Sequence, residues 1–255
     1  MSRTPRHRLG LPPQMMTLDE RLWKTFNKAL GQYQLIDEDD SILVGLSGGK
    51  DSLLLLEFLA RRSRILKPRF KVEALHVRME NIQYETDTAY LQQFCEQRGV
   101  TLHVITTCFL EDNTSQSKPK PPCFLCSWQR RKQLFNLAQQ LGCSKIALGH
   151  HQDDIIHTAL MNLAFHGHFS TMPAKLRMKK MPLTIIRPLC LCAEDDIRQY
   201  AESHHYEKQT KNCPYERVTN RNESRNLFEQ IKRMNDEARY SIWRALEADN
   251  KLIEY

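Results

Sequence analysis

The sequence lacks any long hydrophobic segment. No run of 18 apolar residues occurs among its 255 residues, which argues against a membrane-spanning helix and against a membrane partner. The basic first residues lead into Leu9-Gly10-Leu11-Pro12-Pro13 instead of the apolar core of a signal peptide, so no secretory signal is readable. We therefore expect a cytoplasmic protein whose eight cysteines are thiols, metal ligands or packing residues before they are disulfides.

Internal repeats and low-complexity segments are absent as well. The length suffices for one α/β domain of ordinary size with extensions. The 37 Lys and Arg residues outnumber the 30 Asp and Glu residues, which gives a formal net charge of +7. Such a balance favours a polyanionic partner but does not prove one.

The strongest local pattern is a strand followed by a glycine turn and a helix. Residues 41–46 form an apolar run typical of a strand, and residues 53–59 continue as an apolar helix. Gly48 and Gly49 lie between them and allow the backbone to approach an anion closely. The start of the helix offers unpaired N–H groups and the positive end of its dipole, so the turn has the properties of a phosphate-binding loop.

This loop does not follow the Walker pattern. Lys50 is followed by Asp51 instead of Ser or Thr, and no glycine stands five residues before Gly49. The hydroxyls of Ser47 and Ser52 can donate hydrogen bonds to phosphate, and Asp51 could hold a magnesium ion that bridges phosphates. The alternative is a glycine turn that Ser47 and Asp51 cap and that holds no ligand.

Residues 47–52 (Ser-Gly-Gly-Lys-Asp-Ser) match the Ser-Gly-Gly-x-Asp-Ser signature of the PP-loop ATP pyrophosphatases, which the chain resembles here. The resemblance implies cleavage of ATP between the α- and β-phosphates and an adenylated intermediate. On this interpretation Ser47, Gly48, Gly49 and Ser52 hold the pyrophosphate, Asp51 coordinates magnesium, and Lys50 stabilises the charge that develops on the phosphates.

Strand and helix signals alternate along most of the chain. The alternation predicts an α/β fold of the PP-loop type, in which a parallel five-stranded sheet is sandwiched by helices, with helical extensions at both ends. Ligands of such sheets bind at the carboxyl ends of the strands, where the glycine loop falls. The expected strands cover 41–46, 70–77, 100–106, 145–148 and 183–186, and the expected helices after the loop cover 53–62, 84–98, 126–141, 151–165, 194–204 and 219–253.

Composition divides the chain into four parts. Residues 1–16 form a basic flexible arm, and residues 17–40 hold an N-terminal helix that Thr17-Leu18-Asp19-Glu20 opens. Residues 41–210 form the PP-loop domain, including the loop with the cysteine pair, and residues 211–255 form a C-terminal helical extension. Within the domain, residues 166–182 are expected to form a basic loop.

Cys123-x-x-Cys126 is the second informative pattern, because two thiolates at this spacing can bind zinc, hold an iron-sulfur cluster or form a redox pair. A closed zinc site needs four ligands, and the sequence has no second such pair. Cys213 is the best-placed third thiolate, whereas Cys190 and Cys192 could serve only if the fold brings them near. The alternative is a pair of packing or redox cysteines that binds no metal.

Two acidic residues open the helix after the fourth strand. Asp153 and Asp154 are placed to hold magnesium or a ribose, and the alternative is a charge pair that stabilises the helix start by about 0.3–1 kcal/mol. His150 and His151 could contact phosphate, but a capping or packed histidine is the more frequent case.

Two basic clusters could bind RNA. Arg217, Arg221 and Arg225 are spaced at i, i+4 and i+8 and would form one stripe on a helix. Arg130 and Arg131 form a second cluster beside the cysteines. Basic clusters are also common on solvent-exposed helix faces that bind nothing. Only the position of both clusters around one site therefore supports a role in RNA binding.

Four motifs together resemble the tRNA 2-thiocytidine synthetase family. They are the glycine loop, the cysteine pair before Arg130-Arg131, the run 148–154 (Leu-Gly-His-His-Gln-Asp-Asp) and the run 186–189 (Ile-Arg-Pro-Leu). The resemblance covers roughly residues 20–230. It implies ATP-dependent adenylation of C2 of a tRNA cytidine at position 32 of the anticodon loop, followed by delivery of sulfur through a 4Fe-4S cluster. The three cluster cysteines of the family map onto Cys123, Cys126 and Cys213.

The chain departs from the family pattern in two places. His157-Thr158 stands where the family usually has Glu-Thr, and Cys213-Pro214-Tyr215-Glu216 does not begin a second Cys-x-x-Cys. The alternative is a branch of the family with a different target RNA.

From the sequence we thus predict a tRNA sulfurtransferase that uses ATP, magnesium and a 4Fe-4S cluster. Its partners are tRNA and a sulfur donor that the sequence does not identify, and a homodimer is compatible with it. One alternative is a PP-loop enzyme that modifies another nucleobase or a small molecule and holds structural zinc at its cysteines. The other is a non-enzymatic RNA-binding module.

Overall fold

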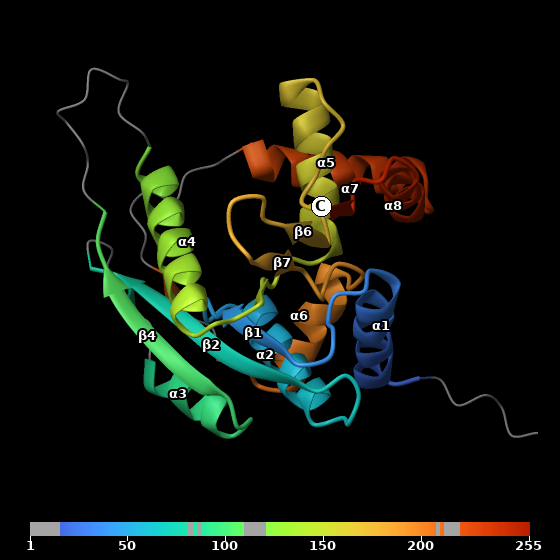
Figure 1. Ribbon diagram of the computed structural model, residues 1–255. Coiled ribbons are helices and arrows are strands. Elements are labelled where there is room, and N and C mark those ends of the chain that lie inside the picture. Colours follow the sequence, from blue (N-terminus) through green and yellow to red (C-terminus); the bar gives the residue numbers. More distant parts are fainter. Residues whose placement is uncertain (1–15, 81–83, 86–87, 110–120, 208–209, 212–219) are drawn as a thin grey trace, which may run out of the picture.

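The computed structural model describes residues 16–80, 84–85, 88–109, 121–207, 210–211 and 220–255. Within these ranges the strands of the main sheet are β1 (Asp40–Gly45), β2 (Phe70–Met79), β4 (Thr101–Thr107), β5 (Lys145–Ala147), β6 (Lys175–Arg177), β7 (Thr184–Ile186) and β9 (Ile253–Glu254). They lie in the order β4-β2-β1-β5-β7-β6-β9 (Figure 1). The helices are α1 (Leu18–Gln32), α2 (Lys50–Ser63), α3 (Thr88–Glu96), α4 (Pro122–Gln140), α5 (Gln152–His166), α6 (Glu194–Ser203), α7 (Asn220–Met234) and α8 (Ala238–Ala248).

Five adjacent strands, from β4 to β7, run parallel, which confirms the α/β class predicted from the sequence. Over the described residues the sheet is two strands wider than expected. β6 pairs antiparallel with β7, and β9 pairs parallel with β6. The expectation of a basic loop over 166–182 was therefore wrong for Lys175–Arg177. β6 has one apolar residue between two basic ones, so it lacks the apolar run that reveals the equally short β5 and β7 in the sequence.

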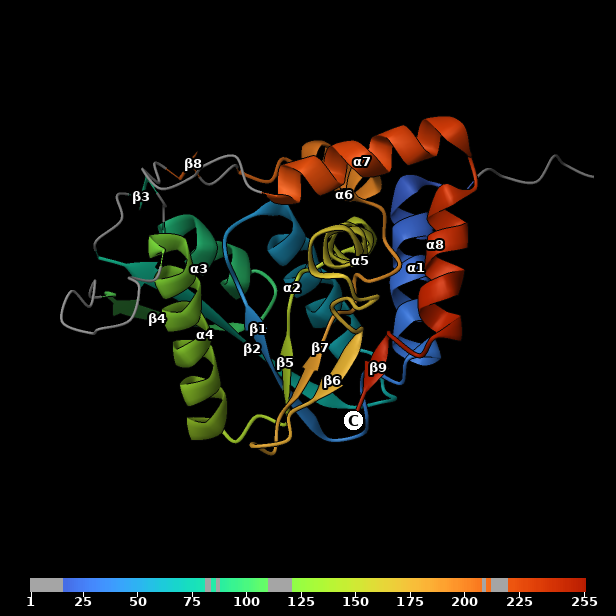
Figure 2. The ribbon, with the colours of Figure 1, turned by 90° about the horizontal axis from the view of Figure 1, so that it is seen from above.

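β1 shows how the sheet separates two apolar layers. Ile42 and Val44 belong to the larger core, to which α1, α2 and α6 contribute, whereas Leu43 between them belongs to a smaller core under α4. Leu134 and Leu137 of α4 pack in that smaller core. Successive side chains of a strand point to opposite faces, so the apolar run of β1 requires cover on both sides. Figure 2 shows α4 on one side of β1 and α2 on the other.

The N-terminal helix begins where the sequence predicts and ends earlier. The hydroxyl of Thr17 accepts from the N–H of Glu20 (3.2 Å), and the Glu20 carboxylate accepts from the N–H of Thr17 (2.9 Å), which completes a capping box. The helix α1 stops at Gln32, where the N–H of Tyr33 bonds the carbonyl of Ala29. Residues 33–39 are not helical, so the predicted helical segment 17–40 was too long.

Two other helices start at different residues than predicted. The helix α3 begins at Thr88 instead of 84, because β3 (Tyr84–Glu85) pairs with β8 (Thr210–Lys211) in a separate small sheet. The helix α4 begins at Pro122 instead of 126, which places both cysteines of the pair inside it. Proline is tolerated in the first turn of a helix because its missing N–H would have no partner there.

The α2 residue Glu57 joins three elements on one face of the sheet. Its carboxylate accepts hydrogen bonds from Arg98, from Tyr200 (2.7 Å) and from Tyr206 (3.1 Å). Burial alone would raise the pKa of Glu57, but these hydrogen bonds outweigh it and hold the pKa below its ordinary 4.5.

Replacing Glu57 by glutamine is expected to lower the free energy of unfolding at neutral pH by about 1–3 kcal/mol, because buried donors lose a charged acceptor. The pKa is lowered in the folded state. The stabilisation is therefore present above the unfolded pKa near 4.5 and is lost as the pH falls through the lower folded value. Urea unfolding should show a gap between wild type and variant at neutral pH that closes in acid. Glu202→Gln, at an exposed pair with Arg198, is the matched control, and a gap as large for this control would contradict the argument.

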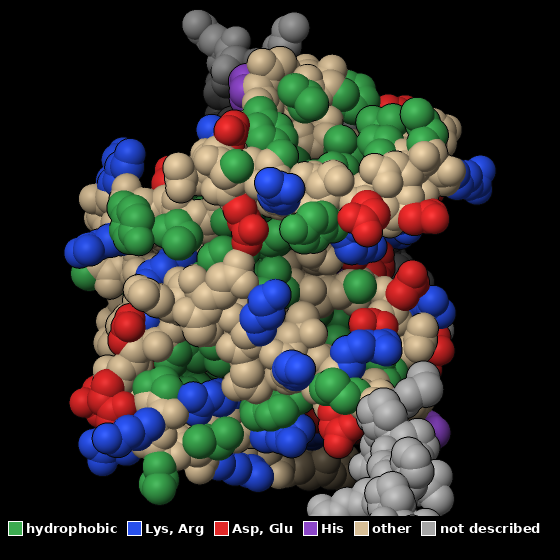
Figure 3. All heavy atoms as spheres, turned by 90° about the vertical axis from the view of Figure 1, so that its right-hand side faces the viewer, with side chains coloured by type: hydrophobic (Ala, Val, Ile, Leu, Met, Phe, Trp, Pro, Cys, Tyr) green, Lys and Arg blue, Asp and Glu red, His purple; other side chains and the backbone are tan. Residues whose placement is uncertain are grey.

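The C-terminal helices pack on the body of the domain. Phe228 of α7 is buried, and its ring meets the His157 ring of α5 edge to face at 5.6 Å. Trp243 of α8 donates its indole N–H to the hydroxyl of Tyr33 at 3.2 Å. On the face that α1 and α8 form, acidic and basic side chains intermix and neither charge dominates (Figure 3). None of the helices that the structure describes combines the length and the apolar character needed to cross a bilayer.

Candidate nucleotide and metal site

The glycine loop joins β1 to α2 at the carboxyl end of the sheet. Gly48 has φ 81°, in the left-handed region that favours glycine. The hydroxyl of Ser52 donates to the carbonyl of Gly49 (2.9 Å) and lies 3.1 Å from the hydroxyl of Ser47. The N-cap of α2 is Gly49, which has no side chain with which to cap the helix. An anion in the loop can therefore accept hydrogen bonds from the first N–H groups of α2.

The connection from β5 to α5 crosses close to the start of α2. A Cβ placed on Gly149 would lie 3.0 Å from the carbonyl carbon of Asp51 and from the backbone nitrogen of Ser52. Only glycine fits without a backbone shift. The glycine loop and the run 148–154, far apart in the sequence, therefore form one site.

Lys50 and Asp51 carry the charges of the loop. The Lys50 ammonium lies 3.1 Å from Asp51 Oδ1 and 3.2 Å from Glu194 Oε1. Burial lowers the pKa of Lys50, but the two carboxylates outweigh it and raise the pKa above its ordinary 10.5, so the ammonium stays charged. Asp51 Oδ1 is buried and, among the described residues, accepts no hydrogen bond.

Glu194 connects this loop to the C-terminal extension. It is the first residue of α6, and its other carboxylate oxygen lies 2.8 Å from the guanidinium of Arg225 on α7. Its own N–H donates to Asp153 Oδ2 at 2.8 Å. Glu194 thus lies between two cations, Lys50 of the loop and Arg225 of the predicted RNA-binding stripe.

Asp153 and Asp154 have different surroundings. Asp153 is buried and lies 2.6 Å from the guanidinium of Arg239 on α8. Burial alone would raise the pKa of Asp153, but Arg239 and the N–H of Glu194 outweigh it and lower the pKa. Asp154 accepts from the N–H of His151 (3.2 Å), while His151 Nδ1 accepts from the N–H of Asp154 (3.4 Å). The interpretation of His151 as a capping histidine is confirmed.

A cavity of about 180 Å³ opens beside the glycine loop. Leu46 and Ser47 border it at the end of β1, and Leu75 and Val77 of β2 and Leu134 of α4 give it apolar walls. Arg130 and Arg131 of α4 also line it. A flat apolar ring attached to phosphates held by the loop has a suitable place there.

The cysteine pair lies in the first turns of α4. Cys123 is exposed and Cys126 is half-buried against Met79 and Phe109. Cys190 and Cys192 are buried in the larger core, where burial raises the pKa of both thiols. Cys213 lies outside the described residues. Within the described ranges no three metal-binding side chains come together, so neither Cys190 nor Cys192 completes a site with the pair.

The predicted RNA-binding arginines fall in two places. Arg130 and Arg131 lie on α4 at the cavity, as described above. Arg225 of α7 is more than half exposed and pairs with Glu194. Arg221 belongs to α7, but its side chain is not among those described, and Arg217 lies outside the described residues.

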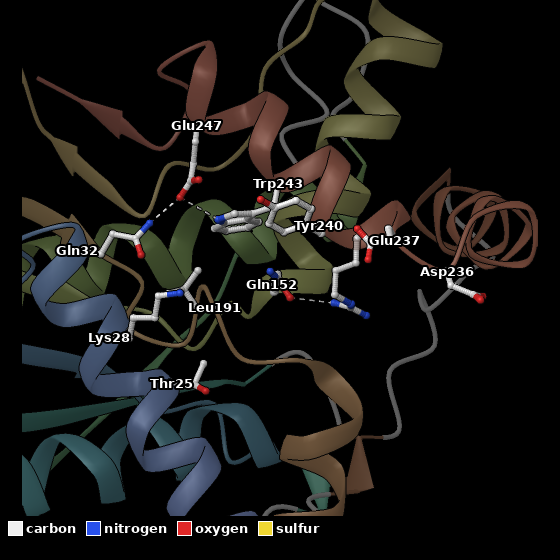
Figure 4. Close-up of a pocket in the computed structure, with 11 residues that line it drawn as sticks. Thr25, Lys28, Gln32, Gln152, Leu191, Asp236, Glu237, Tyr240, Trp243 and Glu247 are labelled. Carbon is white, nitrogen blue, oxygen red and sulfur yellow. Dashed lines mark hydrogen bonds between the residues drawn. The ribbon is translucent and has the colours of Figure 1, made fainter.

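A larger hollow of about 870 Å³ lies between α1 and α8 (Figure 4). Lys28 and Gln32 line one side, Tyr240, Trp243 and Glu247 line the other, and Gln152 and Leu191 also border it. The Gln32 amide donates to the Glu247 carboxylate at 2.6 Å. We place the chemistry in the smaller cavity, because the phosphate loop and the cysteine helix border that one.

A parallel sheet whose central strand ends in a glycine loop at a helix start defines a nucleotide-binding α/β protein. A family model described as a PP-loop domain matches residues 18–232. The tRNA-cytidine(32) 2-sulfurtransferase of Pseudomonas syringae pv. tomato is 33% identical over 251 residues, which cover 93% of this chain and 89% of that protein. The chain therefore belongs to the PP-loop family, within the tRNA 2-thiocytidine synthetase branch that its motifs resemble.

Other relatives match over a smaller share of their length. The tRNA-cytidine(32) 2-sulfurtransferase of Colwellia psychrerythraea is 34% identical over 198 residues, which cover 76% of this chain but 61% of that protein. Among solved structures, the U34-tRNA thiolase NcsA from Methanococcus maripaludis with its 4Fe-4S cluster is similar at a TM-score of 0.72 and 26% identity. That similarity covers 91% of this chain and 79% of NcsA.

Sequence reasoning missed Glu194, Gly149 and Arg239 at this site. Glu194 begins an acidic run that, in the sequence, indicates only the start of a helix. Arg239 lies in a helix whose sequence shows no binding motif. Gly149 lies inside the run 148–154. Its position between an expected strand and an expected helix could have indicated that the backbone passes close to another segment there.

Proposed function

We propose that the protein is an ATP-dependent tRNA sulfurtransferase that replaces O2 of a cytidine, at position 32 of the anticodon loop, with sulfur. The observation that carries the proposal is the single site made by the glycine loop, the adjoining cavity and the cysteine helix α4. Membership of the family supports it, since relatives named for this reaction align along most of the chain. The reaction begins when O2 attacks the α-phosphorus of ATP and pyrophosphate leaves. AMP then leaves as the sulfur nucleophile adds to C2 and the C2–O bond breaks.

The glycine loop is the proposed pyrophosphate site. Ser47, Gly48, Gly49 and the N–H groups at the start of α2 hold the phosphates, and Ser52 keeps the loop in shape through its bonds to Gly49 and Ser47. Lys50 stays charged and can stabilise the negative charge that builds up on the leaving pyrophosphate. The apolar walls of the adjoining cavity suit the adenine ring.

Magnesium fits the loop at Asp51. Its carboxylate oxygens suit a hard cation, and the buried Oδ1 accepts no hydrogen bond from the described residues, although the Lys50 ammonium lies 3.1 Å away. The contacts of Asp153 and Asp154 favour structural roles at helix starts, yet both remain candidates as magnesium or ribose ligands, since each sits within the same site.

The cysteines suit an iron-sulfur cluster better than zinc. Cys123 and Cys126 lie together at the exposed start of α4, and we propose Cys213 as the third ligand. The zinc alternative needs Cys190 or Cys192, and both are held in the larger core with raised pKa values, which opposes the thiolate form that metals bind. A cluster held by these three cysteines would supply iron that can carry the sulfur to be transferred.

The partners follow from this reaction. The protein binds tRNA, for which Arg130, Arg131, Arg217, Arg221 and Arg225 are the proposed contacts, and it works with a sulfur donor in the cytoplasm. A homodimer remains compatible with the proposal.

Mass spectrometry of tRNA nucleosides tests the function. A deletion strain is expected to lose 2-thiocytidine and to regain it when the gene is restored. Purified protein with ATP and the unmodified tRNA should release pyrophosphate. Loss of a different thiolated nucleoside would reassign the target. Pyrophosphate release with a small molecule but no RNA would favour the alternative of a PP-loop enzyme that modifies a small molecule. RNA binding without pyrophosphate release under any condition would favour the non-enzymatic module.

A further inference from the structure

The first half of α4 contributes no fully buried side chain, although Leu125 and Cys126 pack against Met79 and Phe109. The buried residues of this helix, Leu134, Leu137 and Ala138, all lie in its second half. Phe124 and Trp128 in the first half are 44% and 50% exposed. Figure 1 shows the first turns of α4 rising past the end of β4. Two large aromatic side chains are therefore kept at the surface beside the cysteine pair.

Cations accompany these aromatic side chains on the same side of the helix. Phe124, Trp128, Arg131 and Lys132 are spaced at i, i+4, i+7 and i+8, which places them within one helical face. The Lys132 ammonium lies 5.4 Å from the centre of the Trp128 ring. Arg131 and Lys132 are exposed as well. We call these four residues the α4 face.

We propose that the α4 face binds unpaired nucleobases of a single-stranded RNA loop, with Phe124 and Trp128 as the surfaces on which bases stack. Every base has two flat faces, but in a duplex neighbouring base pairs cover them. Exposed aromatic rings can therefore select single-stranded nucleotides, while adjacent cations bind the phosphates between them. The exposed Lys132 makes an RNA chain a better match than an apolar protein partner, since lysine is depleted at the centres of protein interfaces.

The position of the α4 face ties it to the proposed function, on which this inference rests. Cys123 immediately precedes Phe124, and Cys126 lies in the turn between Phe124 and Trp128. The next arginines along the helix, Arg130 and Arg131, line the cavity beside the glycine loop. A loop whose bases stack on the α4 face would thus hold a neighbouring nucleotide near both the cysteines and the ATP site.

Binding of a hairpin RNA with an unpaired loop, compared with the duplex of its stem, tests the proposal. Trp128→Ala is expected to weaken hairpin binding roughly tenfold, within the range known for loss of one base stack, and to leave duplex binding unchanged. Trp128→Phe should restore most of the affinity because it keeps a ring. Tyr240→Ala, at an exposed aromatic residue on α8, is the matched control and should bind as wild type.

Salt dependence separates stacking from charge. Trp128→Ala should lower the affinity without changing the slope of log K against log salt. Lys132→Gln should reduce the magnitude of that slope by about 0.7, the value for one phosphate contact to a single strand. A changed slope for Trp128→Ala would show that the ring acts through its lysine neighbour and would overturn the stacking role.

Tryptophan fluorescence can distinguish base stacking on Trp128 from a purely structural role of this residue. The chain has three tryptophans, and Trp128 is the most exposed of them because Trp243 is buried and Trp23 is half-buried. Stacking of a base on Trp128 should quench emission when hairpin RNA binds, and the quenching should disappear in Trp128→Phe.

The outcomes distinguish this inference from the proposed function. If wild type thiolates tRNA and Trp128→Ala binds hairpin RNA as tightly as wild type, the inference fails alone. If Trp128→Ala binds RNA normally but receives sulfur poorly from its donor, the α4 face is a protein-docking surface instead. If wild-type protein binds no RNA and releases no pyrophosphate, the proposed function fails first.

Discussion

Replacing Asp51 by alanine is expected to abolish ATP-dependent thiolation and to leave the fold intact. Asp51 is the carboxylate of the phosphate loop; its Oδ1 is buried and lies 3.1 Å from the Lys50 ammonium. Its loss removes the proposed magnesium contact and one of the two carboxylates that hold the Lys50 ammonium in place. The rate of pyrophosphate release should fall about a hundredfold or more, the scale of a lost electrostatic contact to a transition state.

The fold should survive because the Asp51 side chain is partly exposed and is not part of the hydrophobic core. It lies in the first turn of α2, where an acidic group stabilises the helix by only about 0.3–1 kcal/mol. Thermal unfolding of the variant should therefore stay close to that of wild type. Asp195→Ala, an exposed acidic residue in the first turn of α6, is the matched control and should keep full activity. Retained turnover of magnesium-ATP by Asp51→Ala would remove Asp51 from the site.

The phosphate loop could be predicted from the sequence because its structure is local. Ser47 and Ser52 lie five residues apart, and their hydroxyls bond each other directly. Residue 48 has a positive φ, a backbone conformation that glycine adopts readily. The strand that precedes the loop carries an apolar run at residues 42–44, as a parallel strand buried on both faces does. For such segments, neighbours in the sequence decide the structure.

The charge pairs around the loop could not be predicted, because their partners are distant in the sequence. Asp153 at a helix start looks like a metal ligand, and nothing near it reveals that Arg239 lies 2.6 Å away. Glu194 looks like an ordinary acidic residue at the start of a helix, although it contacts both Lys50 and Arg225. Charge pairs of this kind appear only once helix packing is known.

These pairs make the C-terminal helices part of the nucleotide site. Arg225 of α7 and Arg239 of α8 neutralise Glu194 and Asp153, both of which are next to the loop. Without these arginines, Asp153 would lose its guanidinium partner and Glu194 would keep only Lys50, so negative charge beside the proposed phosphate site would oppose ATP binding. In the proposed ATP site, the helices at the end of the chain would therefore contribute through charge, even though they lie far from the glycine loop in the sequence.

Replacing Cys123, Cys126 or Cys213 by alanine is expected to remove the cluster and thiolation together. If the three cysteines hold a 4Fe-4S cluster, protein purified without oxygen should be brown and contain about four irons per chain. Each single replacement removes one of only three protein ligands. We therefore expect each variant to lose most of its iron, and not only a third of it. Iron analysis, the visible absorption spectrum and nucleoside mass spectrometry measure the effect.

The remaining cysteines supply controls that show whether a loss of iron is specific to the three proposed ligands. Cys108→Ser removes an exposed thiol without touching the pair, and Cys143→Ala removes a buried one at only a packing cost. Both should keep their iron. Cys190→Ala and Cys192→Ala test the zinc alternative, and they should change stability but not metal content, since both thiols lie in the larger core. If Cys213→Ala kept its iron while Cys190→Ala lost it, the proposed ligand set would be wrong. If the wild-type protein contained zinc in place of iron, the cluster-dependent mechanism would be ruled out.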